Sequence, residues 1–464
     1  MSYETAVAQM YALGHELAQT PAHKFDLEHM RVLLAALGHP ERNFPSVLIA
    51  GTNGKGSTAS TLASILQASG LKTGLYTSPH LVRINERIRL EGAAIADDDF
   101  AVLHDVVGRT AERLVGEGDL PWHPSFFEML TAMAFEYFAR NRPDIVVLEV
   151  GMGGRLDATN VVDPRVSVIT DVSLDHQKFL GETVPEIARE KAGIIRRGGV
   201  VVTLPQLAEA NDVIGNAVLD ADARAVNAVP YVPPVSPGSA DFWANTSRGL
   251  KVEGARQAEG SGNSAGPRQR YPMQVLGEQI LVESPLIGRH QLRNIALAMA
   301  AAVELREQGF TQISAGSIER GIRNTQWPGR FQVITAEGDP EYVLDVAHNP
   351  AGAWALRSTL SAVYQDRAIT MVFGVLRDKA MSEMTEILFP IADRVILTHA
   401  NNPRSATPAE IRQAARPVMS EVSEAESVAL ALEEATGVAG DGIVVVTGSI
   451  YIVGEAMRTL GVCI

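Results

Sequence analysis

Residues 47–57 read VLIAGTNGKGS, and this stretch decides the fold of the first part of the chain. The apolar run at 47–50 is typical of a buried strand, and apolar residues at helical spacing from 58 to 69 predict that a helix follows the turn. Three glycines allow the backbone N–H groups of the turn to point inward, the helix N-terminus adds partial positive charge, and Lys55 adds a full one. We therefore predict a loop that binds the phosphates of a nucleoside triphosphate. Its binding residues are Gly54, Lys55, Gly56 and Ser57.

The spacing of this loop departs from that of the commonest P-loop. Only two residues separate Gly51 from Gly54, and a glycine stands between the lysine and the hydroxyls of Ser57 and Thr58. Either hydroxyl can coordinate a magnesium ion. The alternative is a glycine-rich turn without a ligand, although such turns rarely carry a lysine and a hydroxyl at the start of a helix.

Length, charge and cysteine content exclude several classes of protein. The 464 residues are enough for two or three domains, and 46% hydrophobic with 20% charged residues is an ordinary globular composition. A net charge of -14 argues against a broad nucleic-acid surface. The only cysteine is Cys463, so we expect neither a disulfide framework nor a cysteine-based metal site, which suits the reducing cytoplasm. No apolar run approaches the ~20 residues of a membrane helix, and we expect a monomer without a membrane or nucleic-acid partner.

Apolar, strand-like runs alternate with helix-like stretches along the chain, which is typical of a parallel sheet with crossover helices. The first such runs are 47–50, 73–77, 145–150, 166–170 and 200–204. We therefore predict an α/β fold, with a P-loop ATPase domain of mostly parallel sheet at 1–326. Within it, residues 233–270 are rich in proline, serine and glycine and predict a surface excursion with a short hairpin.

The sequence Trp-Pro-Gly-Arg at 327–330 cannot continue a helix and predicts a hinge. New strand-like and helix-like stretches follow it. We predict that residues 331–464 form a smaller C-terminal α/β domain of the Rossmann-like kind.

Polar residues stand where several of the predicted strands end. Glu149 closes the run at 145–149, and an acid at this place in a P-loop domain usually faces magnesium, a merely solvated glutamate being the alternative. Ser78 offers a second hydroxyl, although a serine before proline is also typical of a turn. His176 is as compatible with capping or packing as with metal binding. In the distal domain, Asp345 and His348 end a strand, which a simple turn does not explain.

The motifs together resemble those of folylpolyglutamate synthases and the bifunctional dihydrofolate synthases, which are members of the Mur ligase superfamily. The resemblance spans about residue 20 to Glu455, apart from 233–270. It implies an N-terminal ATPase domain, a C-terminal α/β domain and an active site in the cleft between them. The motifs, in chain order, are GTNGKGS (51–57), TSPHL (77–81), EVGMGGRLDATN (149–160), EKAGI (190–194), GRHQLRN (288–294), WPGRF (327–331), DVAHNP (345–350) and GSIYIVGE (448–455).

The resemblance also assigns roles to single residues. It implies that Lys191 becomes carbamylated, which would turn an ammonium into an anionic oxygen ligand, and that His348 lines the reaction site with Lys55. Besides the four loop residues, the implied ATP contacts are Asn294, Arg330 and Asp345, and the implied magnesium ligands are Ser78, Glu149 and His176. The segments implied to hold folate or dihydropteroate are Asp26, Leu27 and Glu28; Ser125, Phe126, Phe127 and Glu128; and Leu156, Asp157 and Ala158. The two phenylalanines are equally compatible with ordinary helix core.

The implied activity is ATP-dependent ligation of L-glutamate to tetrahydrofolate and to 7,8-dihydropteroate. A carboxylate is a poor electrophile, so ATP first converts it to an acyl phosphate, which the amine of glutamate then attacks. The reactive acyl phosphate gives a reason for a site that closes before reaction. One alternative is another Mur-type amino acid ligase, such as one for cell-wall precursors, but those generally carry a further N-terminal domain, and only 46 residues precede Val47. A nucleotide-binding regulator is a second alternative, although no Asn-Lys-x-Asp motif is present.

Overall fold

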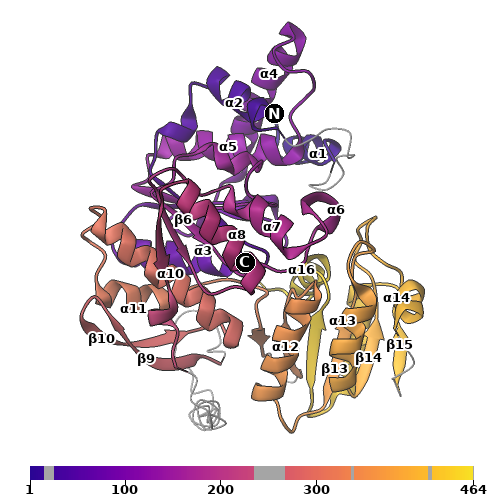
Figure 1. The fold of residues 1–464 in the computed structure, drawn as a ribbon. Helices are drawn as coiled ribbons and strands as arrows, with labels where there is room; N and C mark the ends of the chain where they lie inside the picture. Colours follow the sequence, from indigo (N-terminus) through magenta and orange to yellow (C-terminus); the bar gives the residue numbers. More distant parts are fainter. Residues whose placement is uncertain (15–25, 235–266, 336–338, 416–420, 463–464) are drawn as a thin grey trace. The chain divides into compact units, whose positions relative to one another are not determined.

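The computed structural model describes residues 1–14, 26–234, 267–335, 339–415 and 421–462. The chain divides into two compact units. Unit 1 is made of Met1–Val232, Met273–Ile280 and Arg293–Thr325, and unit 2 contains Leu281–Leu292 and the chain from Gln326 onward. Each unit has its own sheet, and the α/β fold class predicted from the sequence is confirmed (Figure 1). The domain limits and the hinge stay predictions, and most of the predicted excursion, 235–266, lies outside the described residues.

The sheet of unit 1 has eight strands in the order β4-β3-β2-β5-β1-β6-β7-β8. The neighbouring strands in the part of this order β2-β5-β1-β6-β7-β8 are parallel. Strands β3 and β4 are antiparallel to their neighbours and form one edge of the sheet. The predicted strands occur within one or two residues of their expected positions. The strands are β1 (Ser46–Ala50), β2 (Thr73–Tyr76), β3 (Ile88–Leu90), β4 (Ala93–Ala94), β5 (Ile145–Glu149), β6 (Val166–Ile169), β7 (Val200–Thr203) and β8 (Arg224–Asn227).

Helices connect and cover these strands. The helix after the phosphate-binding loop begins at Lys55, and a capping box of Thr183 and Glu186 starts α7. The helices are α1 (Tyr3–Ala12), α2 (Leu27–Ala36), α3 (Lys55–Ala68), α4 (Asp97–Glu117), α5 (Phe126–Asn141), α6 (Gln177–Leu180), α7 (Val184–Ala192), α8 (Ala208–Asp220), α10 (Arg289–Glu307) and α11 (Ala315–Arg323), with 3-10 turns η1 (Pro40–Arg42), η2 (Ile84–Arg87), η3 (Ala158–Val161) and η4 (Val229–Tyr231).

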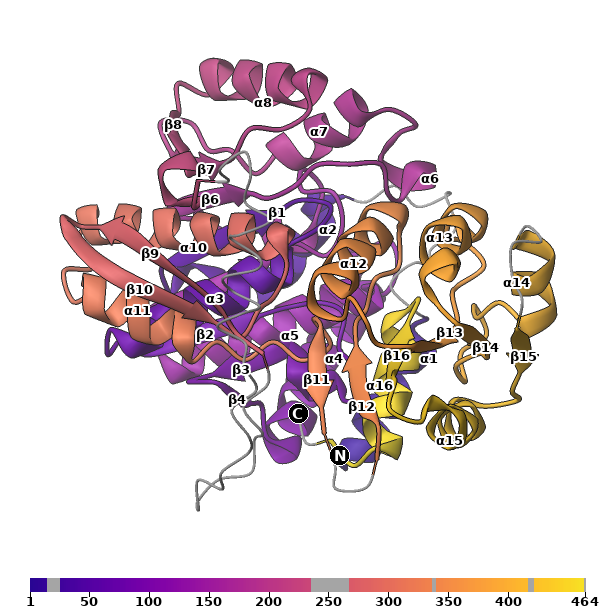
Figure 2. The same cartoon turned by 90° about the horizontal axis from the view of Figure 1, so that it is seen from below.

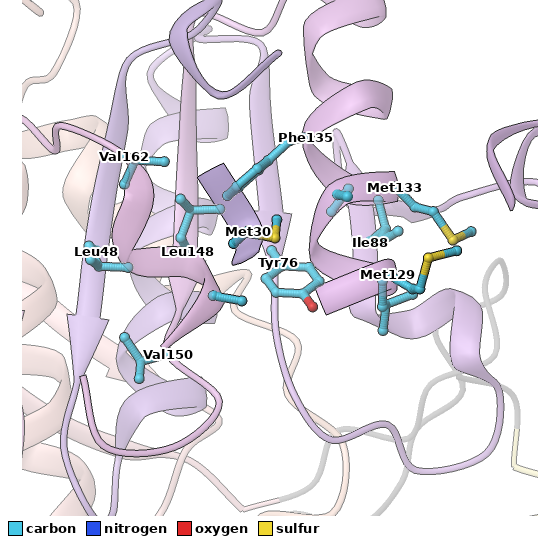
Figure 3. Packing of buried hydrophobic residues seen from close by; sticks show 14 of the residues in the cluster. Met30, Leu48, Tyr76, Ile88, Met129, Met133, Phe135, Leu148, Val150 and Val162 are labelled. Carbon is cyan, nitrogen blue, oxygen red and sulfur yellow. The ribbon is translucent and has the colours of Figure 1, made fainter. Parts of the chain in front are cut away.

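The core of unit 1 follows from the alternation of side chains along its strands. Leu48 of β1 and Leu148 of β5 point to the face that α2 and α5 cover, where they pack with Met30 and Phe135 (Figure 3). All five residues of β1 and of β5 are buried, because helices cover both faces of a parallel sheet. This packing fixes the strand ends from which the candidate site is built.

Unit 2 contains a six-stranded sheet in the order β11-β12-β16-β13-β14-β15, parallel except for β11. Helices α12 and α13 lie on one face of it and α15 and α16 on the other (Figure 2). Its strands are β11 (Gln332–Ile334), β12 (Glu341–Leu344), β13 (Ile369–Phe373), β14 (Arg394–Leu397), β15 (Val422–Glu424) and β16 (Ile443–Thr447). Its helices are α12 (Pro350–Val363), α13 (Met381–Leu388), α14 (Pro408–Ala414), α15 (Val428–Ala439) and α16 (Ile450–Thr459), with the 3-10 turn η5 (Phe389–Ile391).

A separate two-stranded sheet is formed by β9 (Gln269–Val275) and β10 (Glu278–Ser284). Among the described residues, no helix combines the length and the apolar character needed to cross a membrane.

Candidate active site at the phosphate-binding loop

The strand order of unit 1 gathers the predicted polar residues at one edge of the sheet. Strands β2, β5, β1 and β6 are neighbours and parallel, so their carboxyl ends lie side by side. Ser78 follows β2, Glu149 ends β5, the phosphate-binding loop follows β1, and Asp171 follows β6. The carboxyl edge of a parallel sheet is where ligands of such folds bind.

The phosphate-binding loop has the backbone geometry that its glycines predict. Gly54 has a φ of 86°, in the left-handed region, and serves as the N-cap of α3. A Cβ atom at this position would lie 2.9 Å from Cγ of Asn294 in α10, so only glycine fits. The predicted ATP contacts Gly54 and Asn294 are therefore adjacent in the fold.

The loop is braced from β6 by side-chain and backbone hydrogen bonds. Thr170 is fully buried, and its hydroxyl lies 2.8 Å from the carbonyl oxygen of Asn53 and 3.3 Å from that of Ala50. Thr52 donates its backbone N–H to the carbonyl of Asp171 at 2.6 Å and its hydroxyl to the carbonyl of Ser173 at 2.9 Å. These bonds hold the loop in one shape before any ligand arrives, which is the preorganisation that electrostatic catalysis requires.

Two lysines converge on this loop. Lys55 Nζ donates to the carbonyl oxygens of Gly51 at 3.0 Å and Thr52 at 3.1 Å. Lys191, from the last turn of α7, is only 3% exposed and donates from Nζ to the same Gly51 oxygen at 2.7 Å. Burial and the charge of Lys55 lower the pKa of Lys191 to about 7, although nearby carboxylates, Asp175 first among them, act to raise it. Near neutral pH a large share of Lys191 is therefore an uncharged amine.

Of the residues predicted to bind magnesium, Ser78 and Glu149 are in direct contact. This carboxylate is 4% exposed, and its Oε2 accepts a hydrogen bond from the backbone N–H of Ser78 at 3.1 Å. A carboxylate beside a serine, at the edge that carries the phosphate-binding loop, fits a Mg²⁺ ion that takes few protein ligands and completes its shell with phosphate and water. His176 has a φ of 50°, and its Nε2 lies 3.8 Å from Oδ2 of Asp175. Within the part of the chain that the structure describes, no three His, Cys, Asp or Glu side chains form a metal-holding group.

The residues predicted to bind the pterin begin helices. Asp26 is the N-cap of α2 and accepts the N–H of Glu28 at 2.9 Å, with Leu27 buried after it. Ser125 and Glu128 form the capping box of α5.

Phe126 and Phe127, the first two residues of α5, both have protein neighbours. Phe126 is buried, with the ring of Tyr11 stacked at 5.9 Å and the guanidinium of Arg87 at 5.3 Å from its centre. Phe127 packs so closely on Gly151 that a Cβ there would lie 2.5 Å from Cζ of the ring. Their contact with a pterin stays a prediction.

Asp157 organises the loop after β5. Its two oxygens accept the backbone N–H groups of Met152 and Thr159, each at 3.0 Å, and the hydroxyl of Thr159 at 2.5 Å. Burial raises the pKa of Asp157 even though these hydrogen bonds act to lower it. Leu156 is half-buried before it and Ala158 is buried after it, so this whole segment is well fixed.

In unit 2, Asp345 fixes the turn that carries Arg330. Asp345 Oδ2 accepts the N–H of Phe331 and Oδ1 accepts that of Ala347, both at 2.9 Å. Burial raises the pKa of Asp345, although the charge of Arg330 acts to lower it. His348 has its Nδ1 2.9 Å from the carbonyl of Val346, so this nitrogen carries a proton and donates. The ATP contacts predicted for Arg330 and Asp345 and the catalytic role predicted for His348 stay predictions.

The structure also identifies functional candidates that sequence reasoning missed. Thr170 supports the loop from the neighbouring strand, and His29 joins α2 to α5. Arg87 is 4% exposed and donates from Nε to Nδ1 of His80 at 2.8 Å, beside Phe126. Thr170 and His29 act through partners more than 90 residues away in sequence, and no motif spacing marks such a pair.

Comparisons with known proteins agree with this architecture. Residues 329–450 match the family model described as Mur ligase, glutamate ligase domain. The chain is 35% identical to folylpolyglutamate synthase of Lacticaseibacillus casei, with 99% of each chain covered. It is 32% identical to dihydrofolate synthase/folylpolyglutamate synthase of Bacillus subtilis, covering 94% of each. The solved folylpolyglutamate synthase of Mycobacterium tuberculosis, complexed with ADP and AMPPCP, matches with a TM-score of 0.82 and 31% identity over 98% of this chain and 99% of that one.

Proposed function

We infer that this chain, which belongs to the folylpolyglutamate synthase and dihydrofolate synthase family of Mur ligases, is an ATP-dependent ligase that joins L-glutamate to folates. We further infer that it accepts both tetrahydrofolate and 7,8-dihydropteroate. Over 94% of its length the chain resembles the Bacillus subtilis relative, whose name includes both activities. We also propose that it works in the cytoplasm, because Cys463 alone cannot supply a disulfide framework, and that it acts as a monomer.

The observation that carries this proposal is the braced phosphate-binding loop with Lys55 and Lys191 on one carbonyl oxygen. In the reaction, an oxygen of the folate carboxylate attacks the γ-phosphorus of ATP, which forms an acyl phosphate and releases ADP. The amine of glutamate then attacks the acyl carbon, and phosphate leaves with one oxygen of the original carboxylate. Lys55 and the loop N–H groups would stabilise negative charge on the transferring phosphoryl group.

Lys191 suits the carbamylation that the family resemblance implies. The neutral amine, which a pKa of about 7 makes available, adds to carbon dioxide and releases a proton to give an N-carboxylate. The ammonium of Lys55, which acts on the charge of Lys191, would then face an anion instead of another cation. A Mg²⁺ ion held by Glu149 and Ser78 would neutralise charge on the phosphates of ATP.

A glutamate incorporation assay tests the proposed function. Purified protein receives radiolabelled L-glutamate, ATP and Mg²⁺, with dihydropteroate or tetrahydrofolate offered separately. We expect ATP-dependent incorporation with each acceptor. Incorporation with only one acceptor would refute the dual activity, and incorporation with neither would refute the folate ligase assignment.

A further inference from the structure

A buried ion pair joins the two helix starts that carry the predicted folate segments. His29 lies in the first turn of α2, three residues after Asp26, and Glu128 lies in the first turn of α5, three residues after Ser125. His29 Nδ1 is 3.1 Å from Glu128 Oε1, and the two side chains are 5% and 16% exposed. The pair spans 99 residues of sequence, so it fixes one segment against the other and not merely its own helix.

The hydrogen bonds of His29 identify its protonation state. Its Nε2 lies 3.0 Å from the carbonyl oxygen of Trp122, which can only accept, so Nε2 carries a proton. Its Nδ1 faces a carboxylate, which also accepts. A neutral ring would direct a lone pair at one of these acceptors, whereas an imidazolium satisfies both.

The surroundings favour this charged pair. Burial alone would lower the pKa of His29, but the hydrogen bond and charge of Glu128, with the carbonyl of Trp122 and the charge of Asp26, outweigh it and raise the pKa. Burial alone would raise the pKa of Glu128, but hydrogen bonds from His29 and Ser125 lower it. The indole of Trp122 stacks on the imidazole at 5.5 Å between ring centres, which favours a cation further.

Glu128 takes part in both the contact with His29 and the capping box of α5. While Oε1 contacts His29, Oε2 accepts the backbone N–H of Ser125 at 2.8 Å and its hydroxyl at 2.7 Å, closing the capping box. His29 therefore makes two contacts that fix the start of α5: one with the carbonyl oxygen of Trp122 and one with the Glu128 carboxylate that caps the helix.

We propose that His29 is a positioning residue that, as an imidazolium, holds residues 122–128 against the start of α2 and so sets the geometry of the site for the pteroyl part of the folate acceptor. This inference rests on the proposed function. His29 acts through Trp122 and Glu128 and not by touching the reacting atoms. Its loss affects acceptor binding more than ATP binding or the chemical step.

The test compares His29→Asn with His104→Asn in the full-length protein. Both histidines are 6% exposed in unit 1, but His104 lies within α4, outside the predicted acceptor segments. For His29→Asn we expect the KM for the pteroyl acceptor to rise about tenfold, the size expected for loss of a charge-assisted hydrogen bond, with kcat and the KM for ATP within about twofold of wild type. For His104→Asn we expect a lower melting temperature with an unchanged acceptor KM.

If His29→Asn does not fold, His29→Gln, whose carboxamide also donates an N–H but reaches farther than that of asparagine, is measured instead and should raise the acceptor KM by about threefold. An unchanged acceptor KM in a folded His29 variant, or an equal rise for acceptor and ATP, would overturn the positioning role. A rise of the same size in His104→Asn would also overturn it. A wild-type protein without glutamate incorporation would instead refute the proposed function itself.

Discussion

At the scale of single residues, the carbonyl oxygen of Gly51 is the atom that both lysines of the candidate site contact. It accepts hydrogen bonds from the ammonium groups of Lys55 and Lys191, at 3.0 Å and 2.7 Å. Burial of Lys191 and repulsion from the half-buried Lys55 together lower the pKa of Lys191. Conversion of Lys191 to a carbamate relieves this repulsion, since an anion replaces one of the cations.

The carbamate proposal predicts the behaviour of Lys191→Ala. This variant should lose about three orders of magnitude in turnover, because it lacks an anionic oxygen beside the phosphate-binding loop. A short carboxylate such as acetate fills the vacated space and should restore part of the rate, whereas the same salt should not restore Lys55→Ala, which lacks a cation. Glutamate incorporation at increasing acetate concentration measures both. Full activity of Lys191→Ala without added carboxylate would rule out the carbamate.

The brace beneath the loop predicts a separate effect for Thr170. Thr170→Val keeps the shape of the side chain but loses the hydroxyl that lies 2.8 Å from the Asn53 carbonyl, so the loop is less firmly held. We expect kcat/KM for ATP to fall about tenfold, corresponding to about 1.4 kcal/mol, with little change in the KM for the folate acceptor. Thr170→Ser retains the hydroxyl and is the matched control. Equal kinetics of the two variants would show that the hydroxyl does not support the loop.

Residue types and spacing were sufficient to find part of the site. The glycines and Lys55 identify a phosphate-binding loop through local backbone geometry, and Glu149 is marked by its place at the end of a buried strand. Thr170 and His29 are different, because their partners are fixed by which strands and helices become neighbours. Lys191 has no local signal of its burial, and its role was predicted from the family resemblance alone.

At the scale of elements, the close contact between α3 and α11 depends on a glycine. Gly321 in α11 lies where a Cβ atom would be 2.7 Å from the backbone N of Ile65 in α3. Its carbonyl also accepts the hydroxyl of Ser64 at 2.7 Å. Since α3 begins at the phosphate-binding loop, this contact supports the helix that presents Lys55.

Gly321→Ala should therefore separate the two helices and lower the free energy of unfolding by about 1–3 kcal/mol, despite the better helix propensity of alanine. Gly316→Ala in the same helix is the control, because its Cβ meets only the flexible end of Arg320 at 3.3 Å. Chemical denaturation of both variants measures the difference. A Gly321→Ala protein as stable as the Gly316→Ala protein would contradict the close-packing account.

The positions of the buried parallel strands are the part of the fold that the sequence predicts best. Strands such as β1 and β5 are continuous apolar runs because both faces are covered, and such runs are visible without knowing their neighbours. The two-residue strand β4 is exposed and has no such pattern, and β3 is only three residues long. The order of the strands is not readable either, because it depends on long-range pairing.

At the scale of the whole molecule, the chain combines two α/β units with different tasks in the proposed reaction. Unit 1 holds the phosphate-binding loop, both lysines and the predicted acceptor segments. Unit 2 holds Arg330, Asp345 and His348, and includes the whole of the region, 329–450, that matches the glutamate ligase model. In the proposed reaction, the protein activates a folate carboxylate as an acyl phosphate.

The most direct test follows oxygen atoms. Acceptor labelled with ¹⁸O in its carboxylates reacts with ATP and L-glutamate, and the inorganic phosphate is analysed by mass spectrometry. We expect one labelled oxygen to enter phosphate for each amide formed, because phosphate leaves with an oxygen of the activated carboxylate. Amide formation with unlabelled phosphate would rule out the acyl phosphate.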